Sequence, residues 1–272
     1  MKNKIYYRSI GKGRIVIMLP GYGLDHRSLL GCMEPVFKKH DGFKRIYLDL
    51  PAMGRSPALG VKSSKDILNR VLKLISAVAS DTKLILVGYS YGGYLAQHIA
   101  LRMPDLIDGM LLIAPVVFAS ASKRDLPKHK VFVKRYPVSR LKSQEEIDIF
   151  NDLVIQTASV WKNVKKYILS GYLIRNASLL DKIQKRAYSI PGNITKLRQR
   201  IAVPATIITG KQDSVVGYAD SKVILGNYSN GKYIAIDRAG HNLQFEQPDI
   251  FRAIVRKWID DLKKSQHSFL DR

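Results

Sequence analysis

The chain has 272 residues, of which 46% are hydrophobic and 25% are charged. These fractions are close to those of average globular domains and indicate neither a disordered chain nor a membrane protein. The 45 Lys and Arg residues outnumber the 22 Asp and Glu residues, and the charge of +23 favours polyanions, anionic lipid surfaces or acidic substrates as partners. No apolar run approaches the roughly 18 residues that cross a bilayer, and no signal peptide is recognisable, so we expect a cytoplasmic protein.

Short β-branched runs alternate with helical periodicity along most of the chain, a pattern typical of parallel β-α-β units. Strands are predicted at 4–10, 14–20, 43–50, 83–89, 108–114, 204–210 and 232–237. Helices are predicted near 27–39, 64–79, 91–102, 216–226 and 247–264. The nearly continuous apolar character of the central strands predicts a sheet that is covered by helices on both faces.

Residues 115–202 interrupt this alternation with helical patterning and no convincing strand. Two helices are indicated by two sets of spaced residues: Ile147, Phe150, Val154, Ala158 and Trp161, and then Val164, Ile168, Gly171, Tyr172 and Leu179. We therefore predict a helical insertion on a core domain formed by residues 1–114 and 203–272. Trp161 and Tyr172 are interpreted first as packing residues, because apolar stripes of this kind are more often core than ligand site.

The stretch Gly88-Tyr89-Ser90-Tyr91-Gly92 matches the G-x-S-x-G pattern of a nucleophile elbow. The pattern alone is weak, since chance places it in about one chain in ten of this size. Here, however, an apolar strand leads into it and a helix leaves it, which is the context that the motif requires. The N-terminus of that helix would direct free N–H groups toward Ser90, where an oxyanion would develop.

A serine hydroxyl is a weak nucleophile, so a catalytic Ser90 needs a base within hydrogen-bond reach. Among the six histidines, only His241 follows a predicted late strand in a glycine turn, which would place it at the same sheet edge as Ser90. His98 lies inside the helix after Ser90 and is interpreted as structural. A minor alternative places His26 at the entrance to the site. His241 is therefore the predicted base.

Asp213 lies in the loop that follows the strand predicted at 204–210 and is the candidate acid. Asp237, in the last strand, and Asp220, in the following helix, fit this role poorly. An isolated Asp in a loop is usually a turn or capping residue. The chain order Ser, Asp, His nevertheless favours catalysis.

Several motifs together resemble the α/β-hydrolase superfamily, in its branch of esterases and lipases with a helical cap. They are "LPGYG" (19–23), "DLPAMGRS" (49–56), "GYSYGG" (88–93) and the pair "GKQD" and "AGHNLQFEQP". Together they span most of the chain outside residues 115–202. The resemblance implies an α/β-hydrolase fold, with a mostly parallel central sheet flanked by helices and a helical cap inserted after the sixth core strand.

The resemblance also implies a role for each site residue. Ser90 would be the nucleophile, His241 the general base and then acid, and Asp213 the orienting partner of His241. The oxyanion hole would be formed by the backbone N–H groups of Tyr22 and Tyr91.

Three residues depart from the family pattern. Pro20 stands before the first glycine of its motif, where many relatives carry His. Ala52 and Met53 replace a usual pair of glycine and a small residue or His, so we expect Met53 to project toward the pocket. Met53, Trp161 and Tyr172 are the candidate substrate-binding residues.

The predicted function is a serine hydrolase that cleaves a carboxylic ester or related acyl substrate through an acyl-enzyme, without a metal or organic cofactor. Dehalogenases are disfavoured, because their nucleophile is an Asp. Aminopeptidases, thioesterases, C–C bond hydrolases and acyltransferases share the triad and stay open as alternatives. An aminopeptidase would need carboxylates near the pocket, for which Glu145, Glu146 and Asp148 are candidates in basic surroundings. A further alternative is a ligand-binding receptor on a hydrolase scaffold.

Basic residues are concentrated in the predicted insertion. Residues 115–202 hold 18 Lys and Arg against 6 Asp and Glu, and residues 123–142 hold eight basic residues and one acid. The simpler interpretation is a solvated lysine-rich surface, and the alternative is a rim that guides an anionic substrate or a membrane surface. No nucleic-acid motif accompanies the charge, so nucleic acid is disfavoured as a partner. The sequence does not indicate the oligomeric state.

Overall fold

The computed structural model describes residues 4–79, 82–195, 197 and 200–270. These residues form a seven-stranded sheet in the order β1-β3-β2-β4-β5-β8-β9, in which β1 is antiparallel to β3 and the other neighbouring strands are parallel. The strands are β1 (Tyr7–Ile10), β2 (Arg14–Leu19), β3 (Phe43–Leu48), β4 (Leu84–Tyr89), β5 (Ile107–Ile113), β8 (Ile201–Gly210) and β9 (Tyr228–Ile236).

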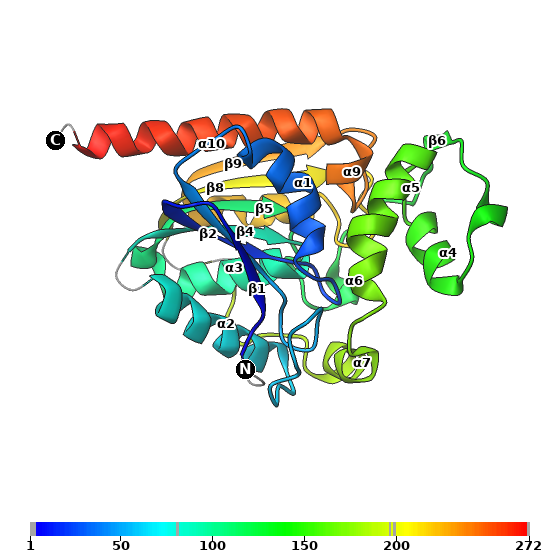
Figure 1. The fold of residues 1–272 in the computed structure, drawn as a ribbon, viewed down its shortest axis with the longest axis horizontal. Helices are drawn as coiled ribbons and strands as arrows, with labels where there is room; N and C mark the ends of the chain where they lie inside the picture. The colour runs from blue at the N-terminus through cyan, green and yellow to red at the C-terminus, as the bar shows by residue number, and fades with distance from the viewer. Residues whose placement is uncertain (1–3, 80–81, 196, 198–199, 271–272) are drawn as a thin grey trace.

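Helices cover both faces of this sheet (Figure 1), as the apolar strands predicted. On one face lie α1 (Arg27–Phe37) and α10 (Pro248–Leu270), and on the other α2 (Ser64–Ala79) and α3 (Tyr91–Arg102). The central strand β4 is buried along its whole length, which explains its unbroken apolar sequence. None of the described helices combines the length and apolar character that a membrane span needs.

Three late elements differ from their predicted bounds. Strands β8 and β9 begin earlier than predicted, because they remain paired as far back as Ile201 and Tyr228. The helix predicted at 216–226 is a single turn, α8 (Asp220–Val223), and Gly217 with a φ of 76° interrupts helical backbone just before it. Short 3₁₀ turns occupy Pro104–Leu106, Ala121–Lys123, Val138–Arg140 and Leu225–Asn227.

The chain between β5 and β8 is called the inserted segment below, and its described residues, 115–195, 197 and 200, lie outside the sheet (Figure 1). Its main elements are β6 (Val133–Lys134), α4 (Gln144–Asn151), β7 (Ile155–Gln156), α5 (Ala158–Val164), a π-helical turn (Lys165–Leu169), α6 (Ser170–Tyr172) and α7 (Ala177–Arg186). It follows β5, the fifth strand of this sheet in chain order rather than the sixth, because β1 alone precedes β2. Residues 201–202 belong to β8.

The inserted segment is more broken than its apolar pattern predicted. The first stripe falls on α4 and α5, because the side chain of Thr157 caps a new helix by accepting a hydrogen bond from the Val160 N–H at 3.3 Å. The second runs from the end of α5 through the π-helical turn and α6 to α7, where Asn176 caps a new helix through the Leu179 N–H at 3.2 Å. Strands β6 and β7, which pair in parallel, have two residues each and are too short to leave a periodic signal.

Candidate active site

Ser90 stands at the sharp turn from β4 into α3. Its backbone has a φ of 53° and a ψ of −114°, a region that residues other than glycine rarely occupy. The turn requires glycine on both sides. A Cβ atom on Gly88 would lie 2.5 Å from the carbonyl oxygen of Gly92, and one on Gly92 would lie 1.9 Å from the carbonyl oxygen of Leu19. The two glycines of the motif therefore let three backbone segments meet beneath the serine.

The structure brings Ser90, His241 and Asp213 together in one hydrogen-bonded chain. His241 Nε2 lies 3.0 Å from Ser90 Oγ, and His241 Nδ1 lies 2.9 Å from Asp213 Oδ2. The three residues follow β4, β9 and β8, so the carboxyl ends of three parallel strands deliver them to one edge of the sheet. Because an ionised carboxylate only accepts, Asp213 places the proton on Nδ1 and leaves Nε2 free to take the proton of Ser90.

Asp213 is held rigidly in its loop. Its side chain is fully buried, and its second oxygen, Oδ1, accepts hydrogen bonds from the N–H groups of Val215 at 2.9 Å and Val216 at 3.0 Å. These donors fix the carboxylate in the orientation that meets His241. The structure thus explains why an isolated loop Asp can serve this position.

Tyr89, to which the sequence assigned no role, contacts the loop that carries His241. Its hydroxyl lies within hydrogen-bond distance of the carbonyl oxygen of His241 and the side-chain oxygen of Asn242, and its ring centroid lies 5.3 Å from that of His241. Burial raises the pKa of the Tyr89 hydroxyl, so the group stays neutral. Its place directly before Ser90, at the end of a buried strand, is the signal that could have identified it.

The backbone amides predicted for the oxyanion hole lie beside Ser90. Tyr91 is the first residue of α3, and the loop after β2 approaches so closely that a Cβ atom on Gly21 would lie 3.5 Å from Ser90 Cβ. Within the described part of the chain, the amides of Tyr22 and Tyr91 donate no hydrogen bond. Two unpaired donors next to a nucleophile are suited to stabilise a negative oxygen.

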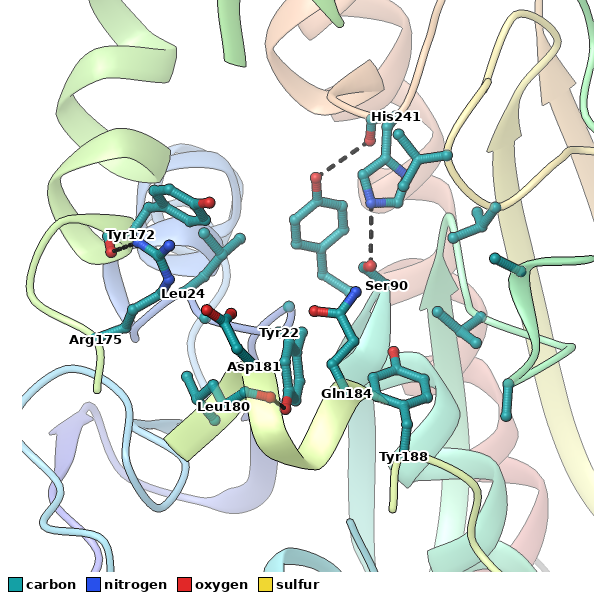
Figure 2. A pocket seen from close by; sticks show the side chains of 18 of the residues that line it. Tyr22, Leu24, Ser90, Tyr172, Arg175, Leu180, Asp181, Gln184, Tyr188 and His241 are labelled. Carbon is teal, nitrogen blue, oxygen red and sulfur yellow. Dashed lines mark hydrogen bonds between the residues drawn. The ribbon is translucent and has the colours of Figure 1, made fainter. Parts of the chain in front are cut away.

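A cavity of about 810 Å³ lies beside Ser90 and His241, between the core and the inserted segment (Figure 2). The core contributes the loop Gly21–Leu24 and the loops around Val215 and Asn242. The inserted segment contributes Val116, Ala119, Ser120, Ala121, Arg124, Ile149, Asp152, Ile168, Tyr172, Arg175, Leu180, Asp181, Gln184, Lys185, Arg186, Tyr188 and Ser189. A bound molecule would therefore contact both parts of the protein.

One polar face of α7 points into this cavity. Figure 2 shows Asp181, Gln184 and Tyr188 projecting toward Ser90. Asp181 and Gln184 are three residues apart and lie on one side of α7, and Tyr188 follows in the loop after that helix. The Tyr22 hydroxyl donates a 2.6 Å hydrogen bond to the carbonyl oxygen of Leu180 and so ties the loop after β2 to α7. The apolar stripes of this region do not predict its polar face, because periodicity of apolar residues indicates only the packed side of a helix.

The cavity wall carries charges of both signs. Arg124 is fixed by hydrogen bonds to the carbonyl oxygens of Phe118 and Val215, both at 3.0 Å. The guanidinium of Arg175 stacks over the ring of Tyr172 at 3.3 Å. Burial raises the pKa of Asp152, while the nearby His241 and His129 oppose this shift. Of the three substrate-binding candidates from the sequence, only Tyr172 lines the cavity.

Met53 and Trp161 lie elsewhere. The side chain of Met53 is fully buried in the core, because the Met53 N–H bonds to the carbonyl oxygen of Leu50 at 2.9 Å and closes a turn that directs it inward. Trp161 packs edge-on against Phe150 with ring centroids 5.4 Å apart. Its first interpretation as a packing residue therefore describes it correctly.

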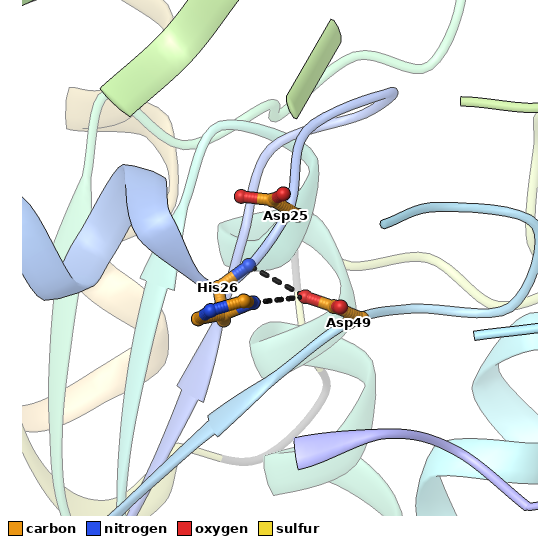
Figure 3. Close-up of side chains that lie close together, drawn as sticks. All are labelled: Asp25, His26 and Asp49. Atoms are coloured by element: carbon orange, nitrogen blue, oxygen red, sulfur yellow. Dashed lines mark hydrogen bonds and ion pairs between the residues drawn. The ribbon is translucent and has the colours of Figure 1, made fainter. Parts of the chain in front are cut away.

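A second cluster of titratable side chains lies close by but outside the cavity. Figure 3 shows Asp25, His26 and Asp49, whose potential metal-binding atoms lie within 4.8 Å of one another. Protein donors already occupy these carboxylates: Asp49 accepts from the backbone N–H and the Nδ1 of His26, both at 2.7 Å, and Asp25 pairs with Arg27. We therefore assign the cluster to holding the loops after β2 and β3 together. His26 does not line the cavity entrance.

Comparisons with known proteins agree with this architecture. The family model described as alpha/beta hydrolase fold matches residues 14–248. A crystal structure of an alpha/beta superfamily hydrolase from Oenococcus oeni superimposes with a TM-score of 0.88 and 30% identity, covering 96% of this chain and 97% of that one. A proline iminopeptidase from Saccharolobus solfataricus is 24% identical over 94% of this chain and 88% of the relative, and a pimeloyl-[acyl-carrier protein] methyl ester esterase from Pectobacterium carotovorum is 24% identical over 91% and 95%. The chain belongs to the alpha/beta hydrolase family.

Proposed function

We propose that this hydrolase is a serine esterase, which cleaves a carboxylic ester or related acyl compound through an acyl-enzyme on Ser90. The observation that carries the proposal is the continuous hydrogen-bonded chain of Ser90, His241 and Asp213 in the wall of a cavity of about 810 Å³. The similarity to a methyl ester esterase also supports cleavage of a carboxylic ester bond.

Each group of the site has a defined task in this reaction. Ser90 Oγ attacks the carbonyl carbon while its proton passes to His241 Nε2. The amides of Tyr22 and Tyr91 bind the negative oxygen of the tetrahedral intermediate. His241 then donates the proton to the leaving oxygen as the ester C–O bond breaks. A water molecule repeats the sequence on the acyl-enzyme, which releases the acid and restores the Ser90 hydroxyl.

The inserted segment serves as the cap of this site in the proposal. It supplies more than half of the residues that line the cavity, including the α7 face opposite Ser90. Covering the reacting atoms excludes bulk water and strengthens the electrostatic contacts there. Tyr172 and the α7 residues are the substrate-binding candidates that the cavity supports.

The test uses a fluorophosphonate probe and a panel of acyl esters that differ in chain length and charge. The wild type should be labelled and should hydrolyse part of the panel, whereas S90A should not be labelled and should lose at least about a thousandfold in kcat. Labelling or ester turnover that survives in S90A would refute the nucleophile. A folded wild type that is neither labelled nor active would support the receptor alternative instead.

A second candidate function is hydrolysis of an amide next to a free amino group. It is favoured by Asp152 and Asp181, two carboxylates in the cavity wall that could hold an ammonium group. The acids suggested for this task by the sequence, Glu145, Glu146 and Asp148, do not line the cavity, because α4 directs Glu146 toward Lys165 instead. The likeness to a proline iminopeptidase agrees with this candidate.

Aminoacyl anilides separate the two candidates. An aminopeptidase should cleave anilides with a free amino group and should fail on their N-acetylated forms. In that case D152N and D181N should raise KM for the anilides but leave a neutral ester unaffected. Equal turnover of free and acetylated anilides would exclude this second function.

A further inference from the structure

Glu246 is a buried carboxylate that joins the His241 loop to the inserted segment. It is the last residue of the short helix α9 (Leu243–Glu246), and only 4% of its surface is exposed. Its Oε2 accepts a hydrogen bond from the N–H of Gly240 at 2.6 Å, and its Oε1 accepts one from the N–H of Val154 at 2.7 Å. One acceptor thus holds the residue before His241, and the other holds the residue before β7.

This carboxylate has no cationic partner. No Lys, Arg or His in the described part of the chain forms an ion pair with it. Burial raises the pKa of Glu246 to about 7, although the N–H groups of Val154, Gly240 and Ile155 favour the charged form. Burying a carboxylate without a cation lowers the stability of the folded protein. The favourable contribution of Glu246 therefore comes from its hydrogen bonds to the two amides.

The backbones of Gly240 and Val154 approach each other closely at Glu246. A Cβ atom on Gly240 would lie 3.1 Å from Val154 Cγ1 and 3.3 Å from Glu246 Oε2, so the two backbones meet at the carboxylate. The Val154 carbonyl oxygen accepts from the Phe132 N–H at 2.8 Å, which continues the connection to β6. Beside it, the ring of Phe245 stacks on Tyr167 of the π-helical turn with centroids 5.9 Å apart. Helix α9 is therefore a surface on which the inserted segment rests.

We propose that Glu246 is a positioning residue, which couples the place of His241 against Ser90 to the docking of the inserted segment by binding the Gly240 and Val154 amides with one carboxylate. This inference rests on the proposed role of His241 as the base. Glu246 touches neither Ser90 nor the cavity, and it acts only through the loop that it holds.

The test is E246Q, with E146Q as its matched control. In Gln, one oxygen is replaced by an NH₂ group, which cannot accept, so either Gly240 or Val154 loses its partner. Glu146 is 5% exposed and also accepts with both oxygens, from the Lys142 N–H at 2.8 Å and from Lys165 Nζ at 2.5 Å, but both donors lie in the inserted segment. Both variants therefore lose one contact of a buried carboxylate, and only E246Q loses a contact to the His241 loop.

Ester turnover is measured at about pH 8.5, where Glu246 is ionised. We expect kcat of E246Q to fall at least about tenfold with KM changed less than about threefold, because a small displacement of the base slows the chemical step. E146Q should keep the wild-type kcat. If E246Q does not fold, E246D serves instead, since its shorter side chain cannot reach both amides. Wild-type kcat in E246Q, or an equal loss in E146Q, would overturn the proposal.

A second measurement does not depend on turnover. The proton between His241 Nδ1 and Asp213 should give a downfield proton resonance, which should shift or broaden in E246Q and stay in place in E146Q. Hydrogen exchange of peptides that cover 238–242 and 153–156 should accelerate together in E246Q. An unchanged resonance and unchanged exchange would reject the coupling even if the protein proved not to be an esterase, whereas S90A tests the proposed function alone.

Discussion

The hydroxyl group of Tyr89 lies 3.3 Å from the carbonyl oxygen of His241 and 3.2 Å from the side-chain oxygen of Asn242. The residue that directly precedes Ser90 therefore holds the loop that carries His241, the proposed base. Since Tyr89 also ends the central strand β4, a single buried strand positions both partners of the proposed proton transfer, Ser90 and His241.

Replacing Tyr89 with Phe should loosen this connection without creating a large cavity. We expect kcat for an ester to fall about threefold to tenfold and the free energy of unfolding to fall by about 1 kcal/mol, the usual value of one such hydrogen bond. Steady-state kinetics and urea unfolding measure the two effects. Tyr228→Phe, at a buried tyrosine at the start of β9, is the control and should keep the wild-type kcat. Equal kcat values in both variants would contradict the role of Tyr89.

Gly92→Ala should prevent the turn at Ser90 from forming. The added methyl group would lie 1.9 Å from the carbonyl oxygen of Leu19, a backbone atom that cannot move aside. We expect a loss of more than about 3 kcal/mol in the free energy of unfolding, or no folded protein. Gly226→Ala is the matched control, because nothing lies within 4 Å of its Cβ position. Urea unfolding that places the two variants within about 1 kcal/mol of each other would argue against the steric reason.

The sequence could predict the parallel sheet, its helical cover and the meeting of Ser90, Asp213 and His241. These features follow from local periodicity and from one topological rule, that parallel strands present their carboxyl ends at the same edge. Each of the three residues lies in the turn or loop after a strand whose apolar run was recognisable. The family match confirms the fold, while the catalytic role of each residue stays a prediction.

The features that the sequence could not predict depend on backbone geometry and on contacts between distant parts of the chain. Thr157 and Asn176 restart helices inside apolar stripes that looked continuous, and their capping role depends on backbone angles. Met53 points into the core rather than into the cavity, because its turn directs it there. Tyr89 and Glu246 act through backbone groups of other segments, and such partners leave no trace in sequence spacing.

The stability contributed by Glu246 should depend on pH with a definite sign. Burial raises its pKa from the ordinary value of 4.5 to about 7, and the negative charge of Asp213 adds to this shift. Between these values the folded protein keeps a proton that the unfolded chain has released, so stability falls as the pH rises. Above pH 7, the raised pKa of Glu246 lowers the free energy of unfolding by on the order of 3 kcal/mol relative to its value at low pH.

E246Q has no such titration and provides the reference. The stability of the wild type relative to E246Q should therefore fall by on the order of 3 kcal/mol between about pH 4.5 and pH 8. Urea unfolding of both proteins across this range measures the difference. Parallel pH profiles would mean that Glu246 does not keep a raised pKa in the folded protein.

Residues 123–142, the basic part of the inserted segment, should bind anionic lipid surfaces through their positive charge. The exposed basic residues of this part are Lys123, Lys128, Lys130, Lys134, Arg135, Arg140 and Lys142, and none of them has a carboxylate partner among the described residues. Leu126 and Val138 are also exposed here, at 41% and 38%. This part of the chain, around β6 and α4, lies at the end of the molecule opposite the C-terminus (Figure 1). A surface of this kind attracts anionic headgroups.

Vesicles with and without phosphatidylglycerol test this expectation. Binding to the anionic vesicles should weaken steeply as the salt concentration rises from about 0.05 to 0.5 M, because screening shortens the range of the attraction. The triple variant K128E/K130E/K134E should lose most of this binding. K62E/K65E/K73E changes the net charge by the same amount at exposed positions on or beside α2 and should retain it. Equal losses in the two triple variants would show that net charge alone, and not this surface, determines the binding.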